Sequence, residues 1–379
     1  MKVPYIMTPG PTQVRENVRF ARAMETTNPD LDIQFYDYYK ETCEKLGEFL
    51  KTKNQVRILS GEGILGLEAA CASLTESGDK VLVIDNGLFG EGFADFVKMY
   101  GGEPVFFKGD RSRKIHINEL KLFLENNKGF KYATVVHCDT PSGVLNDIKY
   151  ICPMLKEKGI LTVVDSVAAM GGEDIRVDEW KIDIALGASQ KCVSAPPGLT
   201  FLSISEDAFK TMENRTSSIP AYYCNLLIWK AYYENKWFPY TMPISDIIGL
   251  RTAIDNILEE GLDYMQRRHK VIAEAVRNAI EEAGLELHIK DGYSSTVTVI
   301  NIPEGIKDQE LRDYMVRKFN VFIAGSFGYL GGKVIRIGHM GENAREDKVA
   351  YTLYALEKSL EELGFKCKGS LADLFKKNM

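Results

Sequence analysis

Several signals that mark whole classes of protein are missing from this sequence. Seven cysteines are scattered through 379 residues, and no two of them form a Cys-x-x-Cys pair. An odd number of isolated cysteines predicts free thiols in a reducing compartment rather than a disulfide framework or a zinc site. The five histidines show no metal-ligand spacing, so we expect no metal centre and a structural role for each histidine.

Signals for membranes and nucleic acids are also absent. No segment approaches the roughly 20 consecutive apolar residues of a membrane span, and Met1–Tyr5 lacks a secretory hydrophobic core. The formal net charge of −6 disfavours a nucleic-acid binder. We therefore expect a cytoplasmic protein that binds neither membranes nor nucleic acids.

What the chain does have is a large apolar content, 45% of its residues, arranged as alternating short runs and helical patterns. In the middle of the chain this alternation is typical of an α/β protein with a doubly wound, largely parallel sheet. Helices such as Ile64–Leu74 and Ile117–Asn126 are expected between several of the strands. The expected strands are Val81–Asp85, Pro104–Lys108, Tyr132–Cys138, Leu161–Asp165, Ile182–Gly187 and Thr200–Ile204.

The last third of the chain has a different pattern. Residues 247–284 are periodic and highly charged and contain Gly261 but no proline, which predicts helices that lead to a second unit. Strands and helices in mixed order follow, as in a smaller α+β domain. Its expected elements are Ser295–Ile302, Asp308–Phe319, Val321–Ala324, Val334–Ile337 and Lys348–Leu363.

A carboxylate and a lysine follow two successive strands of the predicted sheet. Asp165 ends one apolar run, and Lys191 comes shortly after the next. Ligands of open α/β sheets bind beyond the carboxyl ends of the strands. A lysine amine can form an imine with the aldehyde of pyridoxal phosphate, and a carboxylate can keep its pyridine nitrogen protonated. The pair indicates this cofactor, with a helix cap and a solvated lysine as the alternatives.

A glycine-rich turn, Ser60-Gly61-Glu62-Gly63, precedes the expected helix at Ile64. Glycines allow a close approach of the backbone, and the first turn of a helix offers free N–H groups to a phosphate. A purely structural turn is the alternative. Glu62 is an unusual neighbour for a phosphate, so we expect its side chain to point away.

Motifs with a specific order and spacing occur along nearly the whole chain. They are Thr8–Thr12, Ser60–Gly63, Asn86–Gly90, Asp139–Val144, Val164–Val167, Gly187–Lys191, Ala195–Gly198 and Arg336–Gly338. Together they resemble the class V, fold-type I aminotransferases, in particular the alanine/serine–glyoxylate (pyruvate) aminotransferase group. The resemblance implies a large domain with a mostly parallel seven-stranded sheet at 16–249, a small α+β domain at 250–379, and a segment at 1–15 that joins the small domain.

The resemblance also assigns residues to the cofactor ring. Lys191 would be the Schiff-base lysine and would carry the proton between the substrate and the cofactor. Asp165 would pair with the pyridine nitrogen. Val167 and Phe89 would pack against the two faces of the ring, and Thr140 would bond near the ring hydroxyl.

Further roles follow for the phosphate, the substrate and a second subunit. Gly63, Ile64 and Gln190 would hold the phosphate, although some relatives have a histidine at the position of Ile64. Arg336 would clamp the substrate carboxylate, because a planar guanidinium matches it with two parallel hydrogen bonds. Thr241 would reach the partner's phosphate, which implies a homodimer with composite active sites.

Two departures from the family pattern bear on these roles. Phe238 stands where a tyrosine is usual, so one hydrogen bond to the phosphate would be missing. Thr26 and Thr27 replace a pair that is often cationic, which disfavours phosphonate and dicarboxylate substrates.

The expected reaction moves an amino group from alanine or serine to a small 2-oxo acid, glyoxylate or pyruvate. The nearest alternative is 2-aminoethylphosphonate–pyruvate transamination. A lyase such as a cysteine desulfurase is disfavoured by Gln190, where that class tends to have a histidine. A non-catalytic regulator is disfavoured because no room for a DNA-binding domain precedes the large domain.

Overall fold

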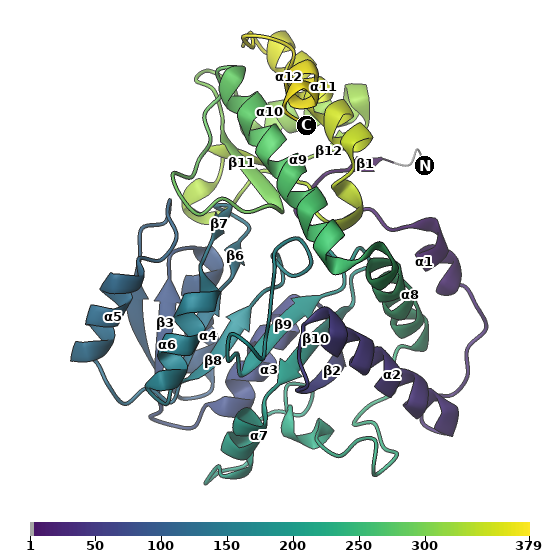
Figure 1. The fold of residues 1–379 in the computed structure, drawn as a ribbon, viewed down its shortest axis with the longest axis vertical. Coiled ribbons are helices and arrows are strands. Elements are labelled where there is room, and N and C mark those ends of the chain that lie inside the picture. Colours follow the sequence, from purple (N-terminus) through teal and green to yellow (C-terminus); the bar gives the residue numbers. More distant parts are fainter. Residues whose placement is uncertain (1–3) are drawn as a thin grey trace.

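A seven-stranded sheet forms the centre of the larger part of the molecule (Figure 1). The structure, a computed structural model, describes residues 4–379, so the first three residues of the expected segment 1–15 lie outside the described residues. In spatial order the strands are β2 (Gln55–Ser60), β10 (Leu199–Ile204), β9 (Ile184–Ala188), β8 (Leu161–Asp165), β5 (Tyr132–Val136), β3 (Lys80–Asp85) and β4 (Glu103–Lys108).

The sheet is parallel apart from one strand. β10 runs antiparallel to both of its neighbours, β2 and β9, whereas the other strands pair in parallel. A mostly parallel sheet is therefore confirmed. All of the expected strands in this sheet are present within about two residues of their predicted bounds. The pattern did not predict β2.

The sequence pattern did not reveal β2 because Arg57 interrupts the apolar residues of this strand. Arg57 is buried because backbone carbonyls satisfy it: its Nε donates to the carbonyl of Trp229 at 3.0 Å and its Nη1 to that of Val56 at 2.8 Å. A charge with such partners can lie inside a protein, although the sequence alone does not reveal them.

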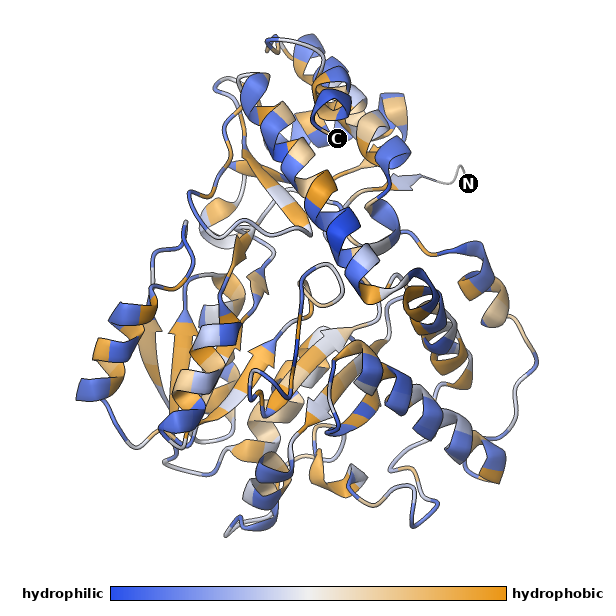
Figure 2. Ribbon diagram, viewed as in Figure 1, coloured by the Kyte–Doolittle hydropathy of each residue, from blue (hydrophilic) through white to orange (hydrophobic). Residues whose placement is uncertain are grey.

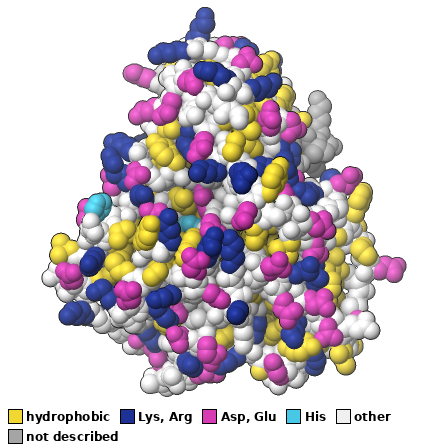
Figure 3. Space-filling view, in the orientation of Figure 1, with side chains coloured by type: hydrophobic (Ala, Val, Ile, Leu, Met, Phe, Trp, Pro, Cys, Tyr) yellow, Lys and Arg dark blue, Asp and Glu magenta, His cyan; other side chains and the backbone are white. Residues whose placement is uncertain are grey.

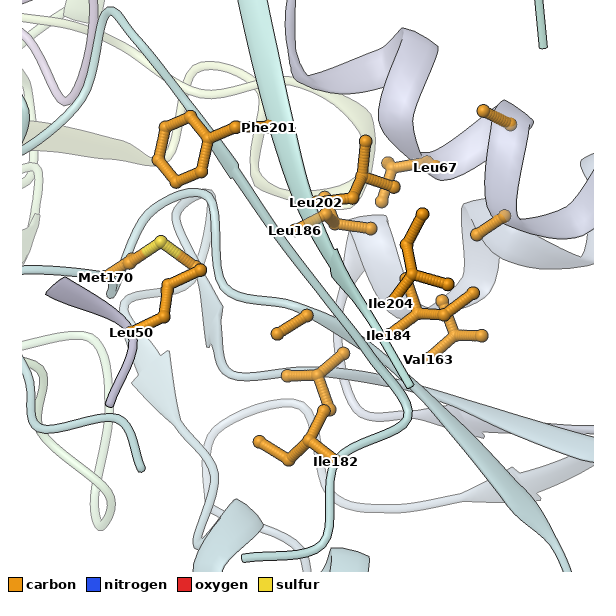
Figure 4. Packing of buried hydrophobic residues seen from close by; sticks show 14 of the residues in the cluster. Leu50, Leu67, Val163, Met170, Ile182, Ile184, Leu186, Phe201, Leu202 and Ile204 are labelled. Carbon is orange, nitrogen blue, oxygen red and sulfur yellow. The ribbon is translucent and has the colours of Figure 1, made fainter. Parts of the chain in front are cut away.

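Helices pack against the sheet with their apolar faces. The strands are largely orange in Figure 2, and the helices around them carry both colours, as expected for buried strands and amphipathic helices. Figure 4 shows Leu67 of α3 near Leu186 and Leu202, and α3 contacts both β9 and β10. The helices of this part are α1 (Glu16–Ala21), α2 (Ile33–Phe49), α3 (Gly63–Leu74), α4 (Leu88–Met99), α5 (Ile117–Asn126), α6 (Ile148–Glu157), α7 (Glu206–Glu213) and α8 (Ile244–Glu260), with a short helix η1 at Leu227–Trp229 and a two-stranded ribbon of β6 (Cys138–Asp139) and β7 (Val144–Leu145).

A smaller group of elements occupies the upper part of Figure 1. The expected helical region divides at Gly261, whose positive φ of 84° ends α8 and starts α9. The strand β13 pairs antiparallel with β11, which places Val299 opposite Arg336. The elements here are α9 (Leu262–Glu282), β11 (Val297–Asn301), α10 (Asp308–Phe319), β12 (Val321–Phe322), η2 (Gly328–Leu330), β13 (Val334–Gly338), η3 (Gly341–Asn343), α11 (Glu346–Glu362) and α12 (Leu371–Asn378).

The N-terminal strand β1 (Tyr5–Ile6) belongs to this smaller group, because it pairs in parallel with β12. Met7 is buried in the same hydrophobic cluster as residues of α9, α10 and α11. The boundary expected between residues 249 and 250 falls inside the continuous helix α8, and the division into domains stays a prediction.

Residues 4–379 contain neither a membrane-spanning helix nor a cluster of metal ligands. No helix there has the length and apolar character needed to cross a bilayer, and no group of three or more His, Cys, Asp or Glu side chains is placed to hold a metal ion. All seven cysteines are free and buried, as expected from their spacing. On the face drawn in Figure 3, cationic and anionic side chains are interspersed.

Candidate active site

A cavity of about 290 Å³ lies at the carboxyl ends of the sheet strands. Most of its lining residues come shortly after a strand, as the topology of an open α/β sheet predicts. It brings together the sequence-predicted residues Gly63, Ile64, Phe89, Thr140, Asp165, Val167, Gln190 and Lys191. Gly10, Glu62, Leu67, Cys138 and Ala168 complete the lining.

Lys191 is held at the cavity by the N-terminal segment. Its Nζ donates to the carbonyl oxygen of Pro9 at 2.7 Å, and the Thr12 hydroxyl donates to the carbonyl oxygen of Lys191 at 2.9 Å. Burial and then the charge of Arg336 lower the pKa of Lys191, whereas Asp165 opposes the shift. The amine is therefore easier to deprotonate than an ordinary lysine.

Gly10 makes room for this lysine. Its φ of +91° lies in the left-handed region, and a Cβ at this position would come within 2.6 Å of Lys191 Nζ. The motif Thr8–Thr12 was recognised in the sequence, but its contact with Lys191 was not. The contact spans 182 residues, and no local pattern carries that information.

Asp165 is the buried carboxylate of the cavity. Burial raises its pKa to about 6, although the N–H of Val167, the amine of Lys191 and other neighbours modify the shift. The Val167 N–H donates to Asp165 Oδ1 at 2.9 Å. A carboxylate held in this environment is matched to a cationic N–H donor, because such a partner would recover the free energy lost on burial.

The first turn of α3 forms another wall of the cavity. The N-cap residue Glu62 makes no side-chain cap hydrogen bond, so the helix terminus is open to a ligand. The expectation that Glu62 points away was wrong. Its side chain lines the cavity, and its Oε2 accepts a hydrogen bond of 3.4 Å from Gln190 Nε2.

Arg336 adjoins the cavity at Thr140, although it is not one of the lining residues. Its Nη1 donates to the carbonyl oxygen of Thr140 at 3.3 Å and its Nε to that of Gly325 at 2.7 Å. Within the described residues 4–379, it forms no salt bridge with a carboxylate. Burial lowers its pKa to about 10, and the charge of Asp139 opposes the shift. A half-buried guanidinium without a carboxylate partner is a natural receptor for an anion.

Thr241 and Phe238 lie outside the cavity of their own chain. The exposed Thr241 donates through Oγ1 to Asp30 Oδ2 at 3.1 Å. Phe238 is buried and stacks on Tyr36 with a centroid separation of 4.4 Å. Whether Thr241 serves a second subunit stays a prediction.

The buried histidines His137 and His339 each have hydrogen-bond partners within the protein. His137 Nδ1 shares a hydrogen bond of 2.9 Å with Ser166, and burial lowers its pKa to about 3. His339 Nε2 lies 2.8 Å from Thr298 Oγ1, and burial lowers its pKa to about 4. Both rings are neutral near pH 7, in keeping with the expected structural roles.

A larger hollow, of about 350 Å³, lies beside Arg57. That guanidinium is already occupied by backbone carbonyls. The smaller cavity is the better candidate site, because it contains Lys191 and Asp165, two buried ionisable groups with shifted pKa values.

The chain is similar to several known proteins. The family model for class-V aminotransferases matches residues 14–328. An uncharacterized aminotransferase of Methanocaldococcus jannaschii is 37% identical over 98% of this chain and 96% of its own length. A pyridoxamine–pyruvate transaminase of Mesorhizobium japonicum is 32% identical over 89% of this chain and 86% of its own length.

Two further relatives extend the comparison to another enzyme and to a crystal structure. An alanine–glyoxylate aminotransferase of Drosophila melanogaster is 30% identical over 95% of this chain and 94% of its own length. The crystal structure of the ureidoglycine–glyoxylate aminotransferase of Bacillus subtilis matches with a TM-score of 0.96 and 30% identity, and covers 100% of this chain and 98% of that chain.

The raised pKa of Asp165 gives a stability prediction. The folded protein keeps this proton up to about pH 6, whereas the unfolded chain releases it near 3.8. Stability therefore falls as the pH rises through this window. We expect Asp165→Asn to stabilise the cofactor-free protein at pH 7 by up to roughly 3 kcal/mol, at 1.36 kcal/mol per pKa unit, with no gain at pH 3.5.

Chemical denaturation at the two pH values measures this difference. Asp110 is the matched control because hydrogen bonds from Ser112 lower its pKa, so Asp110→Asn should change stability in the opposite direction. An Asp165→Asn protein that is less stable than the parent at pH 7 would show that the carboxylate is not strained.

Proposed function

The chain belongs to the class V aminotransferases, and on this basis we propose that it moves an amino group from alanine or serine to glyoxylate or pyruvate with pyridoxal phosphate bound at Lys191. Amino-group transfer rests on the family. The choice of small substrates rests on the resemblance of the motifs and on the alanine–glyoxylate relative. The seven free thiols support a reducing, cytoplasmic location.

The observation that carries the proposal is the pairing of Lys191 and Asp165 in one cavity. A pyridoxal cofactor supplies an aldehyde for the amine and a ring that withdraws electrons from the substrate. Asp165 fits the ring nitrogen, since it is a buried carboxylate with no cationic hydrogen-bond partner among residues 4–379. Val167 and Phe89 offer apolar surfaces for the ring, and the open terminus of α3 offers backbone N–H groups to its far end.

The remaining steps belong to residues of this chain. Lys191, with its lowered pKa, moves the proton to and from the substrate Cα as a neutral amine. Asp165 would pair with the ring nitrogen and keep it protonated. Arg336 orients the substrate by its carboxylate, and the carbonyl of Thr140 fixes the guanidinium beside the cavity.

The structure disfavours the desulfurase alternative. A desulfurase needs a reactive and mobile cysteine, but burial raises the pKa of Cys192, and of Cys138 in the cavity wall, to about 12. Both thiols therefore stay protonated near neutral pH. Thr26 and Thr27, in place of a cationic pair, weigh against the aminoethylphosphonate alternative.

The cofactor assignment predicts a covalent label at one lysine. After incubation with pyridoxal phosphate the protein should be yellow, and borohydride should remove the absorbance band and fix the cofactor. Peptide mass spectrometry should then find the added mass on Lys191. A label on another lysine would end the assignment.

Arg336→Lys tests how the substrate is recognised. The variant keeps the charge but loses the planar fork, so kcat/KM for alanine and serine should fall by about 30–150-fold, or roughly 2–3 kcal/mol, while the cofactor stays bound. The exposed Arg113 pairs with Asp110, whereas Arg336 bonds the lining residue Thr140, so Arg113→Lys should behave like the parent. Unchanged kinetics in Arg336→Lys would remove this residue from the site.

We also propose a homodimer whose sites are shared between subunits. Support comes from the exposure of Thr241 and of its neighbour Trp237, a large apolar side chain at the surface. Mixing Lys191→Ala and Thr241→Ala chains would give heterodimers with one site that has both residues. Activity should then exceed that of either parent, and an inactive mixture would refute the shared site.

A further inference from the structure

Two side chains, Glu62 and Gln190, present acceptor oxygens at the α3 end of the cavity. Gln190 Nε2 donates to Glu62 Oε2 at 3.4 Å. Because a carboxylate has no hydrogen to give, this contact orients the amide group of Gln190. Its Oε1 is left buried with no hydrogen-bond partner within the described residues, and Gln190 itself is only 6% exposed. The position can accept a hydrogen bond from a ligand that enters the cavity.

A phosphate is a poor match for these acceptors. It would face the Glu62 carboxylate, and it has no hydrogen to donate to Gln190 Oε1. Turning the amide would point Nε2 at the phosphate but would break the contact with Glu62. A phosphate ester carries a charge of about −1.5 to −2 at pH 7. The dipole of α3 attracts a negative charge to its first turn, but the Glu62 carboxylate beside Gln190 would repel a phosphate there.

Neighbouring side chains add no compensating charge. Among the described residues, Lys191 is the single cationic residue in the cavity lining. Its charge interacts with that of Asp165. Ile64 is apolar. Phe238 is packed among aromatic rings and has no hydroxyl to donate. A hydroxyl group, in contrast, can donate to Gln190 Oε1 and accept an N–H from α3.

We propose that Glu62 and Gln190 select the unphosphorylated hydroxymethyl group at this end of the ring, so that pyridoxal and pyridoxamine bind at least as well as their phosphates. The inference rests on the proposed function, which places the ring between Lys191 and Asp165. Pyridoxamine then serves as an amino donor. Its amino group passes to the 2-oxo acid, its aminomethyl carbon is oxidised to the aldehyde of pyridoxal, and the keto carbon is reduced to that of an amino acid. Two electrons move between the two substrates, and no other oxidant is needed.

A competition at Lys191 tests the selection directly. The full-length protein is equilibrated with equal concentrations of pyridoxal and pyridoxal phosphate and reduced with borohydride, and the two adducts on Lys191 are compared by mass. The parent should carry the pyridoxal adduct in equal or greater amount. Glu62→Gln should shift the ratio roughly tenfold toward the phosphate, since it removes one repulsive charge that solvent partly screens.

A control variant shows whether the change in Glu62→Gln comes from the charge at the cavity. Glu119 is an exposed carboxylate on α5 that does not line the cavity, so Glu119→Gln should keep the parent ratio. A comparison between variants also cancels the different solution reactivities of the two aldehydes. As a second readout, the parent should convert pyridoxamine and pyruvate to pyridoxal and alanine, and Glu62→Gln should gain activity with pyridoxamine phosphate relative to pyridoxamine.

The outcomes distinguish this inference from the proposed function. A parent that carries mainly the phosphate adduct, with the same ratio in Glu62→Gln, overturns the inference and leaves the aminotransferase proposal in place. A parent that carries neither adduct on Lys191 overturns both. A tenfold shift in Glu62→Gln, with Glu119→Gln unchanged, supports the role of Glu62.

Discussion

The site depends on the burial of ionisable groups at the carboxyl end of the sheet. Water would stabilise each charge, so burial acts against Asp165, Lys191 and Arg336 alike: it raises the pKa of the acid and lowers those of the two bases. The protein tolerates the free-energy cost of burying these charges because the strands and the loops after them hold the groups in place. The same burial that destabilises the free protein makes the cavity a strong receptor for complementary charges.

The sequence was informative wherever the necessary residues are close in the chain. The strand bounds, the helices α5 and α10, and the positions of Asp165 and Lys191 at strand ends all follow from local hydrophobic patterns and turn residues. The antiparallel direction of β10 did not follow, because strand pairing depends on the path of the connecting chain. Arg57 concealed β2, since the carbonyl of Trp229 that satisfies it lies 172 residues away.

The same reasoning explains what was missed in the site. Glu62 and Gln190 are 128 residues apart. From the sequence, a glutamate in a glycine-rich turn suggested only a side chain that avoids the phosphate. The structure places it in the cavity, against the amide that was expected to bind the phosphate. A family resemblance transfers roles most safely where side-chain chemistry matches, and Lys191 and Asp165 meet that condition better than this turn does.

The N-terminal segment explains how the two parts of the molecule meet at the site. Its carbonyl at Met7 accepts the N–H of Gly338 on β13 at 2.8 Å, and its carbonyl at Pro9 accepts the amine of Lys191. The strand that carries Arg336 and the loop that carries Lys191 are thus connected through two bonds of one short segment. Gly338 permits this close approach, because a Cβ there would collide with the backbone of the segment. The spacing between the Arg336 guanidinium and the Lys191 amine is therefore set by backbone contacts, and these remain when a surface side chain is exchanged.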